Sequence, residues 1–171
     1  SDEARDSGVP IIFVRNIYAT DQGWYLSEVT HSQTKRTLRG LNHGVRLCAK
    51  DTWGWDYFGE VRPRDGDCEV FKHRYNAFID TDLPLILRSK DIRTLIICGV
   101  TTNVCVESTT RHAYFLDYYC VVPDDAVAAY GDDLHEMALK NIDFLFGEVT
   151  GSDKIIETLA ANAQARTAGQ A

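Results

Sequence analysis

Residues 93–111 read R-T-L-I-I-C-G-V-T-T-N-V-C-V-E-S-T-T-R, and this stretch decides the fold. Residues 93–98 form a largely apolar run without alternation, which is typical of a strand buried on both faces of a parallel sheet. Gly99 ends the run, residues 101–103 supply side chains suited to a helix N-cap, and residues 104–118 can continue as a helix. The stretch therefore predicts a strand, a tight turn and a helix whose first turn contains Cys105.

The rest of the chain repeats this alternation. Short apolar or β-branched runs predict further strands at residues 9–14, 68–72, 120–123 and 147–149, and helical spacing predicts helices at 81–90, at 132–146 and from 152 onward. Strands that alternate with helices favour the α/β class, with an open, mostly parallel, Rossmann-like sheet flanked by helices. In such sheets, functional sites form at the carboxyl ends of the strands.

One domain should occupy residues 1–171, with 165–171 as a disordered tail. The polar segment 15–50 can contain a helix at 29–39, and we interpret it as a lid or an oligomerisation arm. The aromatic residues of 53–58 fit a pocket wall or an interface patch, and equally a plain packing cluster.

Composition excludes several classes of protein. The chain has a formal net charge of −7 and scattered basic residues, which argues against nucleic-acid partners. Its longest apolar run, 94–100, is far shorter than the roughly 20 residues that span a bilayer, and its first residues are acidic where a signal peptide is basic. We therefore expect a cytoplasmic protein without membrane contacts. The five cysteines lack metal or redox spacing and should be free thiols.

The position of Cys105 suits nucleophilic chemistry. The positive end of a helix dipole favours the thiolate, and the free N–H groups of a first turn can stabilise an oxyanion. Lys72 ends the predicted strand 68–72, so the sheet can bring its ammonium group close to the sulfur. The alternative is structural, since cysteines at helix starts often serve as small core residues and lysines at strand ends are often solvated.

Three further motifs accompany the cysteine block: P-x-x-G-D at 63–67, K-x-R-Y at 72–75 and L-R-S-x-x-I at 87–92. Together with G-V-T-T-N-V-C-V-E-S-T-T-R at 99–111, they resemble the isochorismatase-like cysteine hydrolases. The similarity extends over residues 9–149, and it is greatest to the branch that includes ureidoacrylate amidohydrolase and biuret hydrolase.

The resemblance implies a Cys/Lys/Asp triad in which Cys105 is the nucleophile and Lys72 lies beside it. It also implies a cis peptide bond between Val100 and Thr101, and an oxyanion hole built from the backbone N–H groups of Thr101 and Cys105. Three residues fall where the family has substrate-binding positions: Tyr75, Asn76 and Phe78. Three others match residues that we interpret as capping or bracing the helix: Asn103, Glu107 and Arg111.

One family feature has no counterpart in this sequence. Family members begin with an apolar strand that ends in D-x-Q, and its aspartate is the third member of the triad. We therefore expect the chain to be an N-terminally truncated form that lacks this strand and its helix, a unit of roughly 30 residues. A chain that truly begins at Ser1 should show little amidase activity.

The implied activity is cysteine-dependent hydrolysis of a small amide or ureide through a thioester, with release of ammonia. The only D-x-H pair, Asp133 to His135, follows the cysteine, and we interpret it as a solvated helix face, so no metal or other cofactor is expected. Relatives suggest a homotetramer or a homodimer. The competing hypothesis is a catalytically incomplete subunit that serves as a structural or interaction module.

Overall fold

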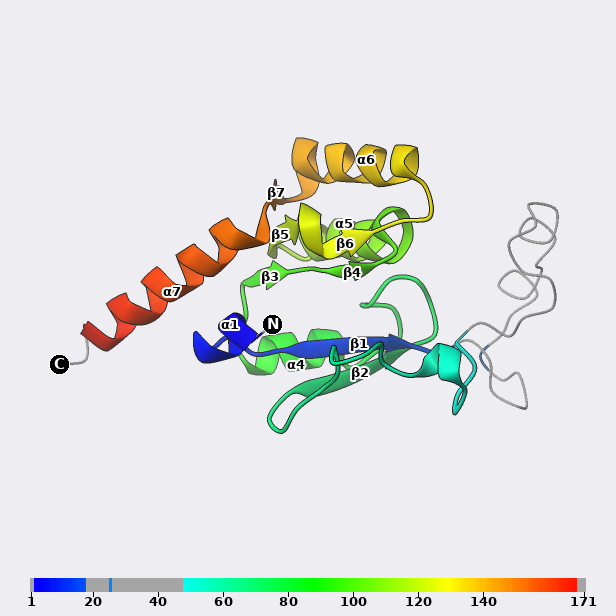
Figure 1. Ribbon diagram of the computed structural model, residues 1–171, viewed down its shortest axis with the longest axis horizontal. Coiled ribbons are helices and arrows are strands. Elements are labelled where there is room, and N and C mark those ends of the chain that lie inside the picture. The colour runs from blue at the N-terminus through cyan, green and yellow to red at the C-terminus, as the bar shows by residue number, and fades with distance from the viewer. Residues whose placement is uncertain (1, 18–24, 26–47, 169–171) are drawn as a thin grey trace.

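The computed structural model of the protein describes residues 2–17, 25 and 48–168 (Figure 1). Its helices are α1 (Asp2–Asp6), α4 (Leu83–Ser89), α5 (Glu107–Phe115), α6 (Asp132–Asn141) and α7 (Ser152–Ala168). Its strands are β1 (Ile12–Asn16), β2 (Cys68–Lys72), β3 (Thr94–Ile96), β4 (Gly99–Val100), β5 (Tyr119–Pro123), β6 (Val127–Ala128) and β7 (Glu148–Thr150). Short helical turns are η1 (Trp53–Trp55), η2 (Thr102–Val106), η3 (Asp124–Ala126) and η4 (Ile142–Phe146).

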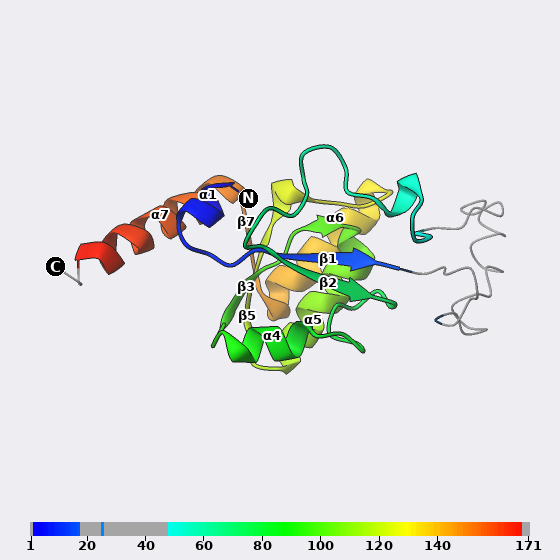
Figure 2. The ribbon, with the colours of Figure 1, turned by 90° about the horizontal axis from the view of Figure 1, so that it is seen from below.

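Parallel strand pairing confirms the predicted α/β class. The strands form three hydrogen-bonded sets, β1–β2, β3–β5–β7 and β4–β6, and every pair in them is parallel. Figure 2 shows β1 and β2 running alongside each other. We expected one open sheet. Within the described ranges, no strand pairing joins these three sets to one another, so they are separate ladders.

The predicted strand 93–98 is shorter in the structure, and a second short strand follows it. β3 ends at Ile96 and pairs with β5, whereas β4 begins at Gly99 and pairs with β6. Gly99 has a φ of 111°, which side chains larger than hydrogen rarely allow. We expected Gly99 to end the strand. It instead changes the direction of the chain, and β4 then leads directly into the turn that contains Cys105.

The first strand lies further along the chain than the sequence predicted. β1 replaces the expected strand at 9–14 and includes Arg15, which we assigned to the polar segment 15–50. The Arg15 guanidinium carbon lies 3.7 Å from the ring centroid of Trp55 and 4.5 Å from that of Tyr57. Cation–π contacts of this kind cover a charged side chain with aromatic surface, so the ladder can continue through it.

The aromatic cluster is therefore divided between two environments. Trp55 stacks over Phe71 with ring centroids 6.3 Å apart, which supports the packing interpretation for this part of the cluster. Trp53 and Phe58 are exposed by 89% and 84%. The predicted helix at 29–39, and with it most of the segment interpreted as a lid or arm, lies outside the described residues.

Two clusters of buried side chains form the core. The first joins β2, α4, α5 and β5 and contains Val70, Ala77, Phe78, Leu83, Leu87, Ala113 and Cys120. The second joins η2, β5, β6 and η4 and contains Val106, Val122, Val127 and Ile142. Because α5 follows η2 directly, packing of both segments into these clusters fixes the position of Cys105. No helix of the described residues is long and apolar enough to cross a membrane.

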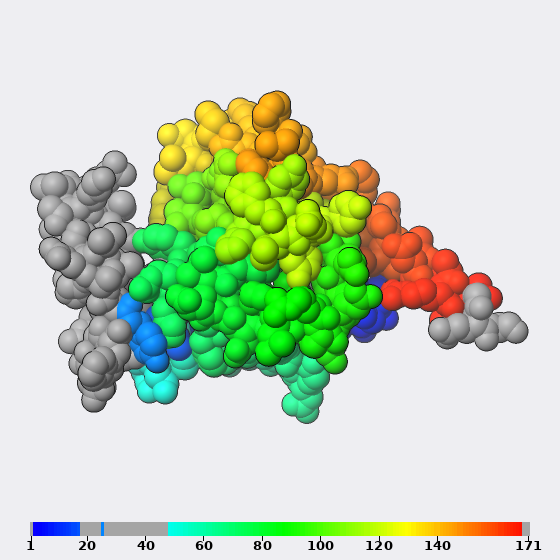
Figure 3. Space-filling view, turned by 180° about the vertical axis from the view of Figure 1, so that it is seen from behind, coloured from blue at the N-terminus to red at the C-terminus, as the bar shows by residue number. Residues whose placement is uncertain are grey.

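The C-terminal helix α7 is longer than expected. Residues 165–168, which we assigned to a disordered tail, belong to this helix. Alanine, glutamine and arginine have high helix propensity, and this overrides the fraying that we expected near the end of the chain. Arg166 also donates a hydrogen bond to the Ser7 carbonyl at 3.1 Å. Figure 3 shows α7 projecting from the body of the molecule, and none of its residues is buried.

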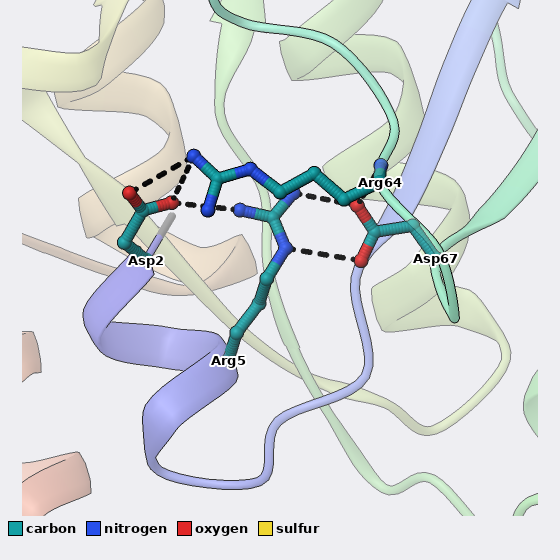
Figure 4. A network of polar contacts seen from close by, with 4 residues as sticks. All are labelled: Asp2, Arg5, Arg64 and Asp67. Atoms are coloured by element: carbon teal, nitrogen blue, oxygen red, sulfur yellow. Dashed lines mark hydrogen bonds and ion pairs between the residues drawn. The ribbon is translucent and has the colours of Figure 1, made fainter.

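A network of ions attaches α1 to the turn before β2 (Figure 4). Arg5 donates two hydrogen bonds to the Asp67 carboxylate, from Nε at 3.1 Å and from Nη2 at 2.6 Å. The Arg64 N–H donates to the same carboxylate at 2.9 Å, and the Arg64 guanidinium contacts Asp2 at 3.0 Å. The P-x-x-G-D motif thus serves as a docking point for α1.

Replacing Asp67 by asparagine is expected to reduce the dependence of stability on acid pH. The hydrogen bonds from Arg5, followed by the one from the Arg64 N–H, hold the pKa of the Asp67 carboxyl below its ordinary value of 3.8. A lowered carboxyl pKa stabilises the fold above that ordinary value, and the contribution is lost as the pH falls through the folded-state pKa. Urea midpoints at pH 6 and pH 3 should therefore differ less for Asp67→Asn than for the wild type. Asp65→Asn, in the same turn, is the control, and an Asp67→Asn difference equal to that of the control would contradict the assignment.

Candidate active site

Cys105 lies in η2, between β4 and α5. The N–H groups of Val104 and Val106 both donate to the Thr101 carbonyl at 3.2 Å, and the second of these bonds spans five residues, as in a π-helix. The sequence predicted the first turn of an ordinary helix at this place. The wider turn is a correction, and single π turns of this kind are frequent at functional sites.

Lys72 points at the cysteine from the end of β2. Its side chain is only 5% exposed, and its Nζ donates to the Arg74 carbonyl at 3.0 Å and to the Tyr75 carbonyl at 2.8 Å. The third contact of Nζ is the Cys105 sulfur at 3.4 Å. An ammonium group has three N–H donors, so these contacts use all of them. The structure therefore brings together the two residues that were paired from their positions in the sequence.

The peptide bond between Val100 and Thr101 is cis, as the resemblance implied. This bond joins β4 to η2, so it lies on the chain between the strand and the cysteine. The Thr101 carbonyl that follows it is the acceptor for Val104 and Val106, which leaves the Cys105 N–H out of both hydrogen bonds.

The residues after Lys72 differ in what they do. The Asn76 side chain donates to the Ser108 carbonyl at 2.9 Å and accepts a hydrogen bond from the Phe78 N–H at 2.9 Å. Phe78 is 5% exposed and belongs to the first core cluster. We expected both residues to contact substrate, but the geometry gives them structural roles, because one is engaged by the backbone and the other is buried. Tyr75, by contrast, is 40% exposed and supplies a carbonyl to Lys72.

Glu107 and Arg111 brace the helix that follows the cysteine. The Arg111 guanidinium contacts Glu107 Oε1 at 2.7 Å, one turn away on α5. The same oxygen accepts a hydrogen bond from the Asn141 amide at 3.3 Å, which connects α5 to the end of α6. Arg111 also lies over the Phe146 ring at 4.1 Å. The bracing roles predicted for Glu107 and Arg111 are consistent with these contacts.

His135 contacts the turn that contains the cysteine, and the sequence did not reveal this. Its Nδ1 lies 2.9 Å from the hydroxyl of Thr102, which is fully buried in η2. Our interpretation of His135 as part of a solvated helix face is therefore wrong. No spacing signal connects two residues 33 positions apart. Within the described ranges, no group of three or more His, Cys, Asp or Glu side chains could hold a metal ion.

Replacing His135 by alanine is expected to lower the free energy of unfolding by about 1–2 kcal/mol, because the buried Thr102 hydroxyl would lose its partner. Denaturant unfolding measures this change. Glu136→Ala is the matched control, because this neighbouring side chain is exposed and forms a surface ion pair with Lys140. An equal effect of the two substitutions would contradict a specific role for the histidine.

The fold and the site together define a class: an α/β protein with a buried lysine and a cysteine at the carboxyl ends of parallel strands. The model of the isochorismatase domain matches residues 1–154, and the chain belongs to the isochorismatase family. Among solved structures, the cysteine hydrolase from Pseudomonas syringae pv. phaseolicola 1448A is similar, with a TM-score of 0.79 and 28% identity. This match covers 94% of the present chain and 76% of that chain.

Other relatives carry the names of amide-cleaving enzymes. The ureidoacrylate amidohydrolases of Serratia proteamaculans and Yersinia enterocolitica are 37% and 36% identical, over 92% and 94% of this chain. The chain spans 66% and 73% of their lengths. N-carbamoylsarcosine amidase from Thermoplasma acidophilum has a TM-score of 0.70 and 28% identity, and this match covers 89% of this chain and 78% of that one.

Proposed function

We propose that this protein is an amidohydrolase that uses Cys105 to cleave the C–N bond of a small amide or ureide. The observation that carries the proposal is the contact of 3.4 Å between the Lys72 ammonium and the Cys105 sulfur. An ammonium group this close to the sulfur can stabilise the negative charge that the sulfur carries when it attacks. The relatives named ureidoacrylate amidohydrolase and N-carbamoylsarcosine amidase support the substrate class.

The reaction proceeds through a thioester. The Cys105 sulfur attacks the substrate carbonyl carbon and forms a C–S bond, and the N–H groups of Thr101 and Cys105 donate to the resulting oxyanion. The C–N bond then breaks, and the nitrogen leaves as ammonia with the proton that the Cys105 thiol gave up on attack. Water attacks the thioester, the C–S bond breaks, and the acid product leaves as the thiol is restored.

The same proposal covers the substrate class, the cellular compartment and the oligomeric state. The partner is a small molecule that carries a carbamoyl or terminal amide group, and the enzyme acts in the cytoplasm as a homodimer or homotetramer. We expect this acyl transfer to need no cofactor, because the nucleophile, the cation and the oxyanion donors all come from the chain.

Ammonia release from a ureide panel tests the proposal. Ureidoacrylate, biuret and N-carbamoylglycine are the candidate substrates, with an ester of similar size as the comparison. We expect ammonia from at least one ureide and, in quenched samples, a protein mass increased by the acyl group on Cys105. Absence of both signals from every ureide, in a protein whose fold is intact by circular dichroism, would overturn the proposal.

A further inference from the structure

Asn16, the last residue of β1, lies beside the buried lysine. In the register of the β1–β2 ladder it is the partner of Lys72. The pairing is continued by a hydrogen bond from the Ile17 N–H to the Lys72 carbonyl at 2.8 Å, and His73 Nδ1 contacts the Ile17 carbonyl at 2.9 Å. These contacts keep the chain at Asn16 in register with β2.

The side chain of Asn16 shares a face of the ladder with that of Lys72. Paired residues on neighbouring strands point to the same side, and successive residues alternate. In β2, Val70 and Lys72 are 3% and 5% exposed, whereas Phe71 between them is 41% exposed. The register therefore directs Asn16 to the inner face, on which the lysine approaches Cys105.

The amide oxygen of Asn16 is buried and has no hydrogen-bond partner. An unpaired buried acceptor costs about 1–3 kcal/mol, so its presence requires an explanation. Lys72 cannot satisfy it, because the three donors of its ammonium group are used by Arg74, Tyr75 and Cys105. The unpaired oxygen of Asn16 therefore lies on the strand next to Lys72, the residue that contacts the Cys105 sulfur.

We propose that Asn16 Oδ1 accepts a hydrogen bond from the substrate nitrogen that is retained on cleavage, the N–H on the far side of the carbonyl from the departing ammonia. This inference rests on the proposed function. The groups that we assign to catalysis, the Lys72 ammonium and the backbone N–H groups of Thr101 and Cys105, are donors. The N–H of a ureide needs an acceptor, and Asn16 Oδ1 is an unpaired one on the face of Lys72. Asn16 thereby selects ureides of the form –NH–CO–NH2 over simple amides of the form –CH2–CO–NH2.

The test compares two substrates that differ at one position. N-carbamoylglycine has the N–H, and succinamate has a methylene group in its place. Asn16→Leu preserves the size of the side chain and removes the acceptor. We expect it to lower kcat/KM for N-carbamoylglycine by roughly 10- to 100-fold and to change kcat/KM for succinamate by less than about 3-fold. Asn162→Leu, on the projecting helix α7, is the control and should change neither.

Thermal unfolding separates this role from a structural one. Removing an acceptor that has no protein partner should leave the stability equal or higher, so the melting temperature of Asn16→Leu should not fall. A lower melting temperature, or an equal loss for both substrates, would assign Asn16 to the structure and overturn the inference. An unchanged ratio of the two kcat/KM values would overturn it while the proposed function stands. Failure of the wild type to release ammonia from either substrate, or from the ureide panel, would overturn both.

Discussion

Replacing Cys105 by alanine is expected to lower kcat by about four orders of magnitude or more, with little change in the fold. The loss is large because no thioester can form without the sulfur, and removing the nucleophile of a catalytic set costs nearly all of its contribution. The fold should persist because Cys105 is only partly buried and its turn is held through Thr101 and Thr102. Ammonia release and circular dichroism measure the two effects.

The serine variant and a second cysteine provide the controls for this prediction. Cys105→Ser keeps a hydroxyl at the same place but gives a far weaker nucleophile, so it should be almost as inactive. Cys98 is an exposed free cysteine, and Cys98→Ala should retain most of the activity. Full activity of Cys105→Ala would eliminate covalent catalysis by this residue.

Replacing Lys72 by methionine is expected to give the second-largest effect. Methionine retains the length of the side chain but removes the charge that lies 3.4 Å from the sulfur. The sulfur then loses an ammonium group that can stabilise its negative charge, and alkylation of Cys105 by iodoacetamide at pH 7 should slow by about 10-fold or more. Ammonia release should fall by at least the same factor, because the same thiolate attacks the substrate. Peptide mass spectrometry after timed alkylation measures the first change at Cys105 alone.

A lysine elsewhere on the molecule serves as the control for the charge. The Lys140 side chain is 71% exposed and pairs with Glu136 on the surface of α6. Lys140→Met changes the net charge by the same amount but should leave the alkylation rate of Cys105 unaltered. Equal alkylation rates in Lys72→Met and the wild type would show that the ammonium does not activate the sulfur.

The sequence predicted the centre of the site well because the centre depends on local patterns and on strand ends. β2 occupies the predicted residues 68–72, and the turn between β4 and α5 contains Cys105 as expected. Both residues lie where parallel strands end, and although β2 and β4 belong to different ladders, the packing of these ladders brings the two ends together. The motif around the cysteine and the family resemblance together sufficed to pair it with Lys72.

The remainder depends on contacts between residues that are distant in the sequence. The pairing of His135 with Thr102, and the use of Asn76 as a brace for α5, have no periodic signal. The predicted bounds of β1 were wrong, because the hydrophobicity pattern does not show that Arg15 is covered by Trp55. The unpaired oxygen of Asn16 likewise becomes visible only when the ladder register is known.

The anchoring of the Lys72 ammonium has a consequence for how this protein can diversify. Two of its three contacts are main-chain oxygens, those of Arg74 and Tyr75, and every amino acid has such an oxygen. Mutations at these two positions can therefore change the side chains next to the reactive pair without displacing the charge. Selection can alter which molecules enter while the reactive pair stays in place.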